Sequence, residues 1–203
     1  MKTADVIIVG SGASGLFNAL FLPQDYKVIV ITKKEVEESD SFLAQGGISA
    51  LKNPEDYDSY FEDTMKAGHY ENDKGAVEKM IKESPQIIQD LKDFGVRFDL
   101  KDGEIEFTRE GGHSTFRILH HEDLTGKEIT SHLYEEAKKR DNITIMENCT
   151  MIDIIEKDGE CKGIVYKDAD GNLDTIEAPD TVLATGGLGG LFLSLIHISE
   201  PTR

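Results

Sequence analysis

The chain has 203 residues, with 22 Lys and Arg against 39 Asp and Glu, which gives a formal net charge of −17 at pH 7. An acidic balance of this size excludes nucleic acid as a partner and an anionic membrane as a docking surface, because both require clustered basic side chains. The hydrophobic fraction of 38% is sufficient for a folded core. Two cysteines cannot form a disulfide scaffold, and no signal peptide precedes them, so we expect a reduced, cytoplasmic protein.

The first 35 residues predict a strand, a tight turn, a helix and a second strand. Residues 5–9 (DVIIV) and 27–31 (KVIVI) are short runs rich in β-branched residues, and the segment LFNALFL between them favours a helix. A strand–helix–strand unit of this length builds a parallel sheet, because parallel neighbours need a crossover connection.

Further helices are predicted downstream, after a loop over residues 32–53. Residues 55–70 and 74–94 carry apolar side chains at helical spacing. Within the second segment, the Ser84-Pro85 pair predicts either a new helix start or a kink. Gly95 is predicted to end this segment, because glycine is favoured just beyond a helix C-terminus.

The second half of the chain changes from helical to β patterns. Residues 96–125 show mixed short-strand and turn character, and residues 126–139 predict one helix. Residues 143–185 read as strands, with Asp-Gly and Gly-Asn neighbours that indicate a hairpin. The predicted fold class is therefore α/β, with a parallel sheet and a β-rich insertion around residues 143–180.

The segment between the first strand and the first helix has the pattern G-x-G-x-x-G, formed by Gly10, Gly12 and Gly15. This pattern indicates dinucleotide binding, because glycines permit a tight turn and let the backbone approach a pyrophosphate at a helix N-terminus. Dinucleotide-binding folds usually carry an acidic residue that binds the ribose, about 20 residues after this turn. Thr32 stands at that position here, and two lysines follow it. The turn alone therefore leaves both FAD and NADP open.

Four later sequence motifs help to choose between FAD and NADP. They are residues 41–48 (SFLAQGGI), 108–114 (TREGGHS), 117–120 (RILH) and 184–187 (ATGG). In this order they resemble the N-terminal part of the L-aspartate oxidase family, within the succinate dehydrogenase and fumarate reductase flavoprotein superfamily. The resemblance implies a Rossmann-like FAD-binding domain over residues 1–192, incomplete at its C-terminus, with the family's capping and C-terminal helical domains absent.

The resemblance also implies which residues contact the cofactor. The respiratory relatives attach the flavin through a histidine, but Asp40 stands at the matching position here, so non-covalent FAD is expected. The histidines and cysteines show no spacing suited to zinc, and no metal site is predicted. The implied FAD contacts are Ser11, Gly12, Ala13, Ser14, Lys33, Asp40, Ser41, Phe42, Leu43, Ala44, Gln45, Gly46 and Gly47.

Glu110 matches the family's substrate-orienting glutamate and is the implied catalytic-site residue. His113, Ser114 and Arg117 either meet substrate carboxylates or hydrogen-bond within the protein. The implied reaction is oxidation of L-aspartate to iminoaspartate with oxygen or fumarate as acceptor, the first step of de novo NAD biosynthesis, with functional coupling to quinolinate synthase. The alternatives are a fumarate reductase or succinate dehydrogenase flavoprotein, and a non-catalytic dinucleotide-binding module.

Residues 193–203 (LSLIHISEPTR) depart from the family pattern. They resemble a translated sequencing adapter, so we expect a non-native tail there. The family's catalytic arginine and substrate-binding histidines are expected to lie beyond residue 192, outside this chain.

Overall fold

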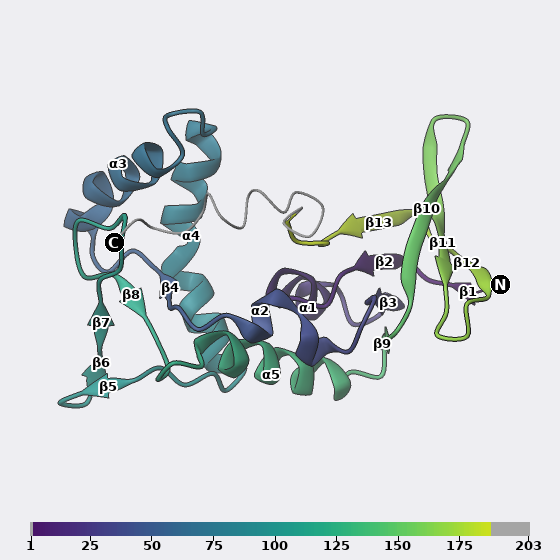
Figure 1. Cartoon of the computed structure of the whole chain (residues 1–203), viewed down its shortest axis with the longest axis horizontal. Helices are drawn as coiled ribbons and strands as arrows, with labels where there is room; N and C mark the ends of the chain where they lie inside the picture. Colours follow the sequence, from purple (N-terminus) through teal and green to yellow (C-terminus); the bar gives the residue numbers. More distant parts are fainter. Residues whose placement is uncertain (1, 188–203) are drawn as a thin grey trace. The chain divides into compact units, whose positions relative to one another are not determined.

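The computed structural model describes residues 2–187, which divide into two compact units (Figure 1). Of the described residues, 2–44 and 129–187 form the first unit, and 45–128 form the second. Residues 188–203, with the expected domain end at 192 and the expected tail, lie outside the described part.

The first unit is built on a four-stranded parallel sheet. The two central strands are buried at every position, because uninterrupted β-branched runs suit a sheet that is covered on both faces. In spatial order the strands are β13 (Asp180–Leu183), β2 (Val6–Val9), β3 (Val28–Ile31) and β9 (Ile143–Met146).

Alternation along β2 sends successive side chains to opposite faces of this sheet. Val6 and Ile8 face α1 (Ala13–Phe21), where Ala19 packs against them. Ile7 and Val9 face a second sheet, where they join a cluster that includes Tyr166. The predicted strand–helix–strand unit is confirmed.

The second sheet of this unit contains the predicted hairpin. Its order is β1-β12-β11-β10, and β11 is antiparallel to both of its neighbours, β10 and β12. Residues 143–146 differ from the prediction, since they pair with β3 in the parallel sheet and not in the β-rich insertion. The strands are β1 (Lys2–Thr3), β10 (Thr150–Lys157), β11 (Glu160–Lys167) and β12 (Leu173–Glu177).

Residues 32–53 were expected to form a loop, and this expectation is wrong. They contain three short elements, which are η1 (Val36–Glu38), α2 (Asp40–Leu43) and β4 (Ile48–Ser49). Elements of two to four residues have no detectable periodicity. They form here because outside groups fix them, as when the Glu147 carboxylate accepts the Val36 N–H at 2.9 Å.

The second unit combines two helices with short strand pairs. Within residues 2–187, none of the helices has both the length and the apolar character needed to cross a bilayer. α5 (Thr125–Lys138) begins in the second unit and continues in the first. The other elements are η2 (Pro54–Asp56), α3 (Tyr57–Ala67), α4 (Lys74–Asp93), β5 (Leu100–Lys101), β6 (Glu104–Ile105), β7 (Phe107–Thr108) and β8 (Ile118–Leu119).

α4 runs unbroken through Pro85, which rules out the two-helix alternative. Proline has no N–H, so the carbonyl of Ile81, four residues earlier, loses its usual helical donor. The Ser84 hydroxyl donates to that carbonyl at 2.7 Å instead, and its oxygen accepts the Leu51 N–H at 2.8 Å. The predicted stop is confirmed, because Gly95 adopts φ +93° just beyond the helix.

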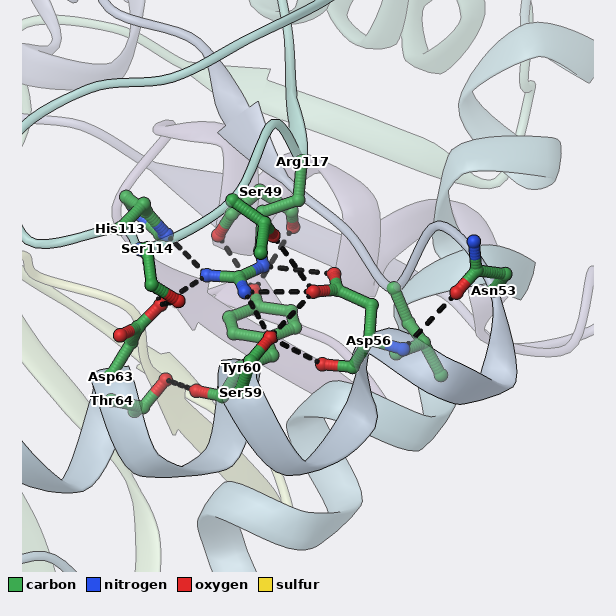
Figure 2. Close-up of polar contacts among 12 residues, drawn as sticks. Ser49, Asn53, Asp56, Ser59, Tyr60, Asp63, Thr64, His113, Ser114 and Arg117 are labelled. Atoms are coloured by element: carbon green, nitrogen blue, oxygen red, sulfur yellow. Dashed lines mark hydrogen bonds and ion pairs between the residues drawn. The ribbon is translucent and has the colours of Figure 1, made fainter.

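A buried arginine, Arg117, connects the segment before β8 to η2 and α3 in the second unit (Figure 2). Arg117 has no exposed surface, and its Nε and Nη2 donate to the two Asp56 oxygens at 2.9 and 2.8 Å. Nη2 also donates to Ser59 at 2.7 Å, and Nη1 to Asp63 at 2.6 Å. The His113 Nδ1 lies 3.2 Å from Nη1 and must accept, because a guanidinium has no acceptor.

This network fixes the loop that carries Glu110. Asp63 accepts hydrogen bonds from both the backbone N–H and the hydroxyl of Ser114 at 2.7 Å. Arg117 lies directly before β8 in the chain. His113, Ser114 and Arg117 therefore all hydrogen-bond within the protein, the second of the two alternatives considered for them.

The carboxylates in this network are held in their charged form. Hydrogen bonds from Arg117 lower the pKa of Asp56 from 3.8 to about 2, against the opposing effect of burial. Burial would raise the pKa of Asp63, but hydrogen bonds from Ser114 and Arg117 hold that pKa below its ordinary value.

The lowered pKa of Asp56 predicts acid sensitivity. A carboxylate whose folded pKa lies below its unfolded pKa stabilises the fold above the unfolded value, and this stabilisation is lost as the pH falls. For Asp56 the loss between pH 5 and pH 2 is about 2 kcal/mol of unfolding free energy. Urea unfolding across this range measures it. Asp56→Asn should be less stable at neutral pH yet lose less on acidification, and an equal loss in both proteins would contradict the assignment.

Candidate functional site

A cavity of about 640 Å³ opens at the carboxyl ends of β13, β2 and β3 in the first unit. Ligands of open parallel sheets bind at this edge, where the connections leave the strands. The cavity is lined by Val9, Gly10, Ser11, Gly12, Ser14, Ile31, Thr32, Lys33, Lys34, Glu35, Glu38, Ser39, Asp40, Ser41, Cys149, Thr150, Met151, Leu183, Ala184, Thr185 and Gly186.

Two glycines of the first turn are required by the fold itself. Gly10 has φ +118°, and a Cβ atom on it would overlap the carbonyl oxygen of Ala184. A Cβ on Gly15 would overlap the carbonyl oxygen of Gly10. These contacts bring β13 and α1 against the end of β2.

Gly12 has a different role. Its φ of −69° is open to any residue, and a Cβ there would meet only the Ser41 hydroxyl at 2.9 Å. Gly12 is also the N-cap of α1, and within the described residues no side chain caps the helix. The N–H groups of the first turn and the positive end of the helix dipole therefore face the cavity and suit a phosphate.

Ser11 contributes a buried hydroxyl to the lining of the cavity. The residue is 2% exposed, and its Oγ has no hydrogen-bond partner within the described part of the chain. A buried hydroxyl without a partner costs about 1–3 kcal/mol, which a ligand oxygen at this point would recover. The residues around the turn therefore fit a dinucleotide cofactor.

The end of β3 supplies the positive charge of the site. Thr32 is buried beneath the cavity, at the position where dinucleotide-binding folds usually carry an acidic residue. Lys34 forms an ion pair with Glu38 at 2.7 Å, and this hydrogen bond raises the pKa of Lys34. Between residues 2 and 187 no ion pair includes Lys33, which leaves that ammonium group to a ligand phosphate.

The predicted cofactor residues are divided between the two units. Those that line the first cavity are Ser11, Gly12, Ser14, Lys33, Asp40 and Ser41. Others belong to the same unit without lining the cavity, namely Ala13, Phe42, Leu43 and Ala44. The remaining three, Gln45, Gly46 and Gly47, belong to the second unit.

A smaller cavity of about 360 Å³ lies within the second unit. Glu110 reaches it beside Gly46, where a Cβ atom would lie 3.5 Å from the Glu110 Oε2. Gly47 is needed for packing, because a Cβ there would overlap Ile118 and the Leu119 carbonyl. The lining residues are Gln45, Gly47, Thr108, Glu110, His120, Glu122 and Asp123.

Sequence reasoning missed several lining residues of both cavities. In the first, residues 149–151 follow β9, whose membership of the parallel sheet was not predicted. Placing that strand beside β3 would have brought these residues to the site. In the second, His120 directly follows β8, a strand of two residues that leaves no pattern in the sequence.

The contrast among the glycines predicts separable effects. Gly12→Val should lower FAD affinity at least about 100-fold, because its side chain occupies the space of the pyrophosphate. The unfolding free energy without FAD should change by less than about 1 kcal/mol. Gly15→Ala is the matched control and should destabilise the fold itself. Flavin fluorescence titration and urea unfolding measure both effects, and undiminished FAD binding by Gly12→Val would contradict the phosphate assignment.

Ser11→Ala should weaken FAD binding and stabilise the FAD-free protein. Removing an unpartnered buried hydroxyl should raise the unfolding free energy of the FAD-free protein by about 1 kcal/mol and weaken FAD binding. Ser14→Ala removes a hydroxyl that is exposed at the same cavity and serves as the control for stability only, because Ser14 is itself an expected FAD contact. A loss of stability in FAD-free Ser11→Ala would show that the hydroxyl already has a partner.

Comparisons with known proteins show that the chain is similar to FAD-binding proteins. A family described as "FAD binding domain" matches residues 5–201. L-aspartate oxidase from Clostridium perfringens is 44% identical over 191 residues, covering 94% of this chain and 43% of that protein. L-aspartate oxidase from Bacillus subtilis is 37% identical over 196 residues, covering 95% of this chain and 36% of that protein. The chain thus spans less than half the length of these curated relatives.

Solved structures show the same fold. FrdA of Escherichia coli quinol fumarate reductase has a TM-score of 0.87 at 28% identity, covering 93% of this chain and 34% of its own. The Mycobacterium smegmatis Sdh1 complex gives a TM-score of 0.83 at 31% identity, covering 93% of this chain and 35% of that one. From the match over residues 5–201 and the cofactor cradle at the β2–α1 turn, the chain belongs to the FAD-binding domain family.

Proposed function

We propose that this chain is the flavin-binding part of an enzyme that oxidises L-aspartate to iminoaspartate, with oxygen or fumarate as electron acceptor. The observation that carries the proposal is the Glu110 carboxylate beside Gly46, in a cavity where none of the lining residues between 2 and 187 is a Lys or Arg. A carboxylate in an acidic cavity suits an ammonium group, which aspartate has and succinate lacks. Relatives named L-aspartate oxidase, aligned over most of the chain, support it.

Residues of the first unit would hold the FAD by its phosphates. The first turn of α1 faces the pyrophosphate, with Gly12 giving it room and Ser11 and Lys33 adding a hydroxyl and a positive charge. Asp40 stands where a histidine would be needed for covalent attachment, so the FAD is non-covalent in this proposal. When bound, the flavin supplies the two-electron oxidant for the substrate.

Residues of the second unit would meet the flavin ring and the substrate. Gln45, Gly46 and Gly47 offer backbone to the ring, and Glu110 binds the substrate ammonium from beside this loop. The contact orients the substrate Cα–H bond, so the contribution of the protein is positioning and charge.

This proposal also implies a metabolic role and a cellular location for the enzyme. Iminoaspartate is the product of the first step of de novo NAD biosynthesis in this proposal, and we propose functional coupling to quinolinate synthase, which consumes it. Cys149 and Cys161 are free thiols, which suits the reducing cytoplasm proposed as the location.

A fumarate reductase or succinate dehydrogenase flavoprotein is the second candidate. The TM-scores of 0.87 and 0.83 with such proteins favour it at the level of fold. Asp40 at the attachment position and Glu110 in the acidic cavity favour aspartate oxidation instead.

Glu110→Gln tests the proposal in the full-length flavoprotein. The substitution keeps the shape and removes the charge that binds the ammonium, a contact worth about 1.5–3 kcal/mol. We expect kcat/KM for L-aspartate to fall about 10- to 150-fold with the flavin retained. Reoxidation of the reduced enzyme by fumarate, which has no amine, should change much less.

Glu104→Gln is the control for this substitution, because Glu104 is exposed on β6 and does not line the cavity. Equal losses with L-aspartate and with fumarate in Glu110→Gln would mean that Glu110 shapes the loop without binding the amine. A wild-type enzyme whose flavin is reduced by succinate and not by L-aspartate would favour the second candidate.

A further inference from the structure

We infer that His120 is the base that removes a proton from the substrate ammonium, and that Asp99 positions it. This inference rests on the function proposed above and adds a second residue to the cavity of Glu110. An α-amino acid can lose hydride from Cα only when its nitrogen has a free lone pair, so a proton must first leave the ammonium.

The geometry around His120 is that of an oriented imidazole. Its Nδ1 lies 3.1 Å from the Asp99 Oδ2. Asp99 is itself fixed, because its Oδ2 accepts the Glu122 N–H at 2.8 Å and its own N–H donates to the His120 carbonyl at 2.8 Å. Glu122 is held at φ +46°, a conformation that a residue with a side chain rarely adopts, so the turn is strained around this carboxylate.

The position of Asp99 favours one of the two ring nitrogens as the base. A carboxylate 3.1 Å from Nδ1 attracts the ring N–H, so it favours the neutral form with its proton on Nδ1 and a lone pair on Nε2. The Nε2 atom is buried and has no hydrogen-bond partner among residues 2–187. His120 lines the same cavity as Glu110. A substrate N–H donor would satisfy this nitrogen.

The charges around His120 favour an ammonium group beside it. Among the described residues, the ionisable groups that share the cavity lining with it are the carboxylates of Glu110, Glu122 and Asp123, and an Asp99 oxygen lies 3.1 Å from Nδ1. The negative charge of these carboxylates attracts the substrate ammonium to the His120 ring.

The step balances in atoms and electrons. The ammonium N–H bond breaks, its proton joins the His120 Nε2, and its electron pair stays on nitrogen. That pair then forms the C=N bond of iminoaspartate as the Cα–H bond breaks. The hydrogen leaves Cα with two electrons, which reduce the flavin. His120 later returns its proton to solvent.

His121 is the natural control, since the two adjacent histidines have similar exposure. Its Nδ1 lies 3.3 Å from the other Asp99 oxygen, and its Nε2 lies 3.9 Å from a Glu128 oxygen. It does not line the cavity. A merely structural role for the histidine pair would make the two residues equivalent, whereas the proposed role belongs to His120.

The test is anaerobic reduction of the full-length flavoprotein by L-aspartate, followed by stopped-flow absorbance across pH 6–9, about the range in which histidine and amino groups change charge. The wild-type rate should rise with pH and level off. His120→Gln should be about 100-fold slower at neutral pH, as expected for loss of a general base, and its rate should keep rising across this range without levelling off, because only solvent then removes the ammonium proton. Asp99→Asn should slow reduction at least about 10-fold, because an amide can donate to Nδ1 and move the ring proton to Nε2. His121→Gln should match the wild type.

Two further readouts separate chemistry from damage to the site. Succinate binding, followed by its change in the flavin spectrum, and reoxidation by fumarate should change much less in His120→Gln than reduction by L-aspartate, because neither involves an amine. If L-aspartate reduces the His120→Gln protein at the wild-type rate and with the wild-type pH profile, the inference about His120 is wrong, while the proposed function still holds. Equal slowing in His121→Gln, or loss of succinate binding in His120→Gln, also overturns it. Absence of reduction by L-aspartate in the wild type overturns the proposed function and this inference with it.

Discussion

The turn between β2 and α1 depends on backbone contacts that only glycine permits. Side chains at Gly10 and Gly15 would overlap carbonyl oxygens, and those overlaps lie between the end of β2, the end of β13 and the first turn of α1. The cavity forms because these three backbones meet without side chains between them. Gly12 then has the separate task of keeping the helix N-terminus open, and the buried hydroxyl of Ser11 lacks a partner at the same point. The unpartnered Ser11 hydroxyl thus lowers the stability of the fold at the point where the cofactor would bind.

In the second unit the comparable constraint is electrostatic. Arg117 has five N–H donors, and Asp56, Ser59, Asp63 and His113 accept them in the absence of solvent. A buried charge of this kind is tolerated only when its partners are complete, so removal of one partner is costly. The same network holds Ser114 and thereby one end of the loop that carries Glu110. Stability and the position of a candidate substrate ligand therefore depend on the same side chains.

The two cavities differ in charge in a way that suits their proposed ligands. The first has a helix N-terminus, an unpaired Lys33 within the described residues, and a buried hydroxyl, which together favour phosphate. The described lining of the second contains three carboxylates and a histidine, which favour an ammonium group. The net charge of the chain reveals neither preference, because it averages over both sites.

The strand–turn–helix unit and the helix stop at Gly95 can be predicted from the amino-acid sequence, because neighbouring residues encode each of them. The resemblance of four short motifs identified the cofactor class in the same local way. The folded structure was needed to see that α4 continues through Pro85, that β9 joins the parallel sheet, and that Arg117 is an internal ion-pair partner. It alone brought Asp99 and Glu110 to His120, across 21 and 10 positions of the chain. These features depend on contacts between distant segments, and such contacts leave no periodicity in the sequence.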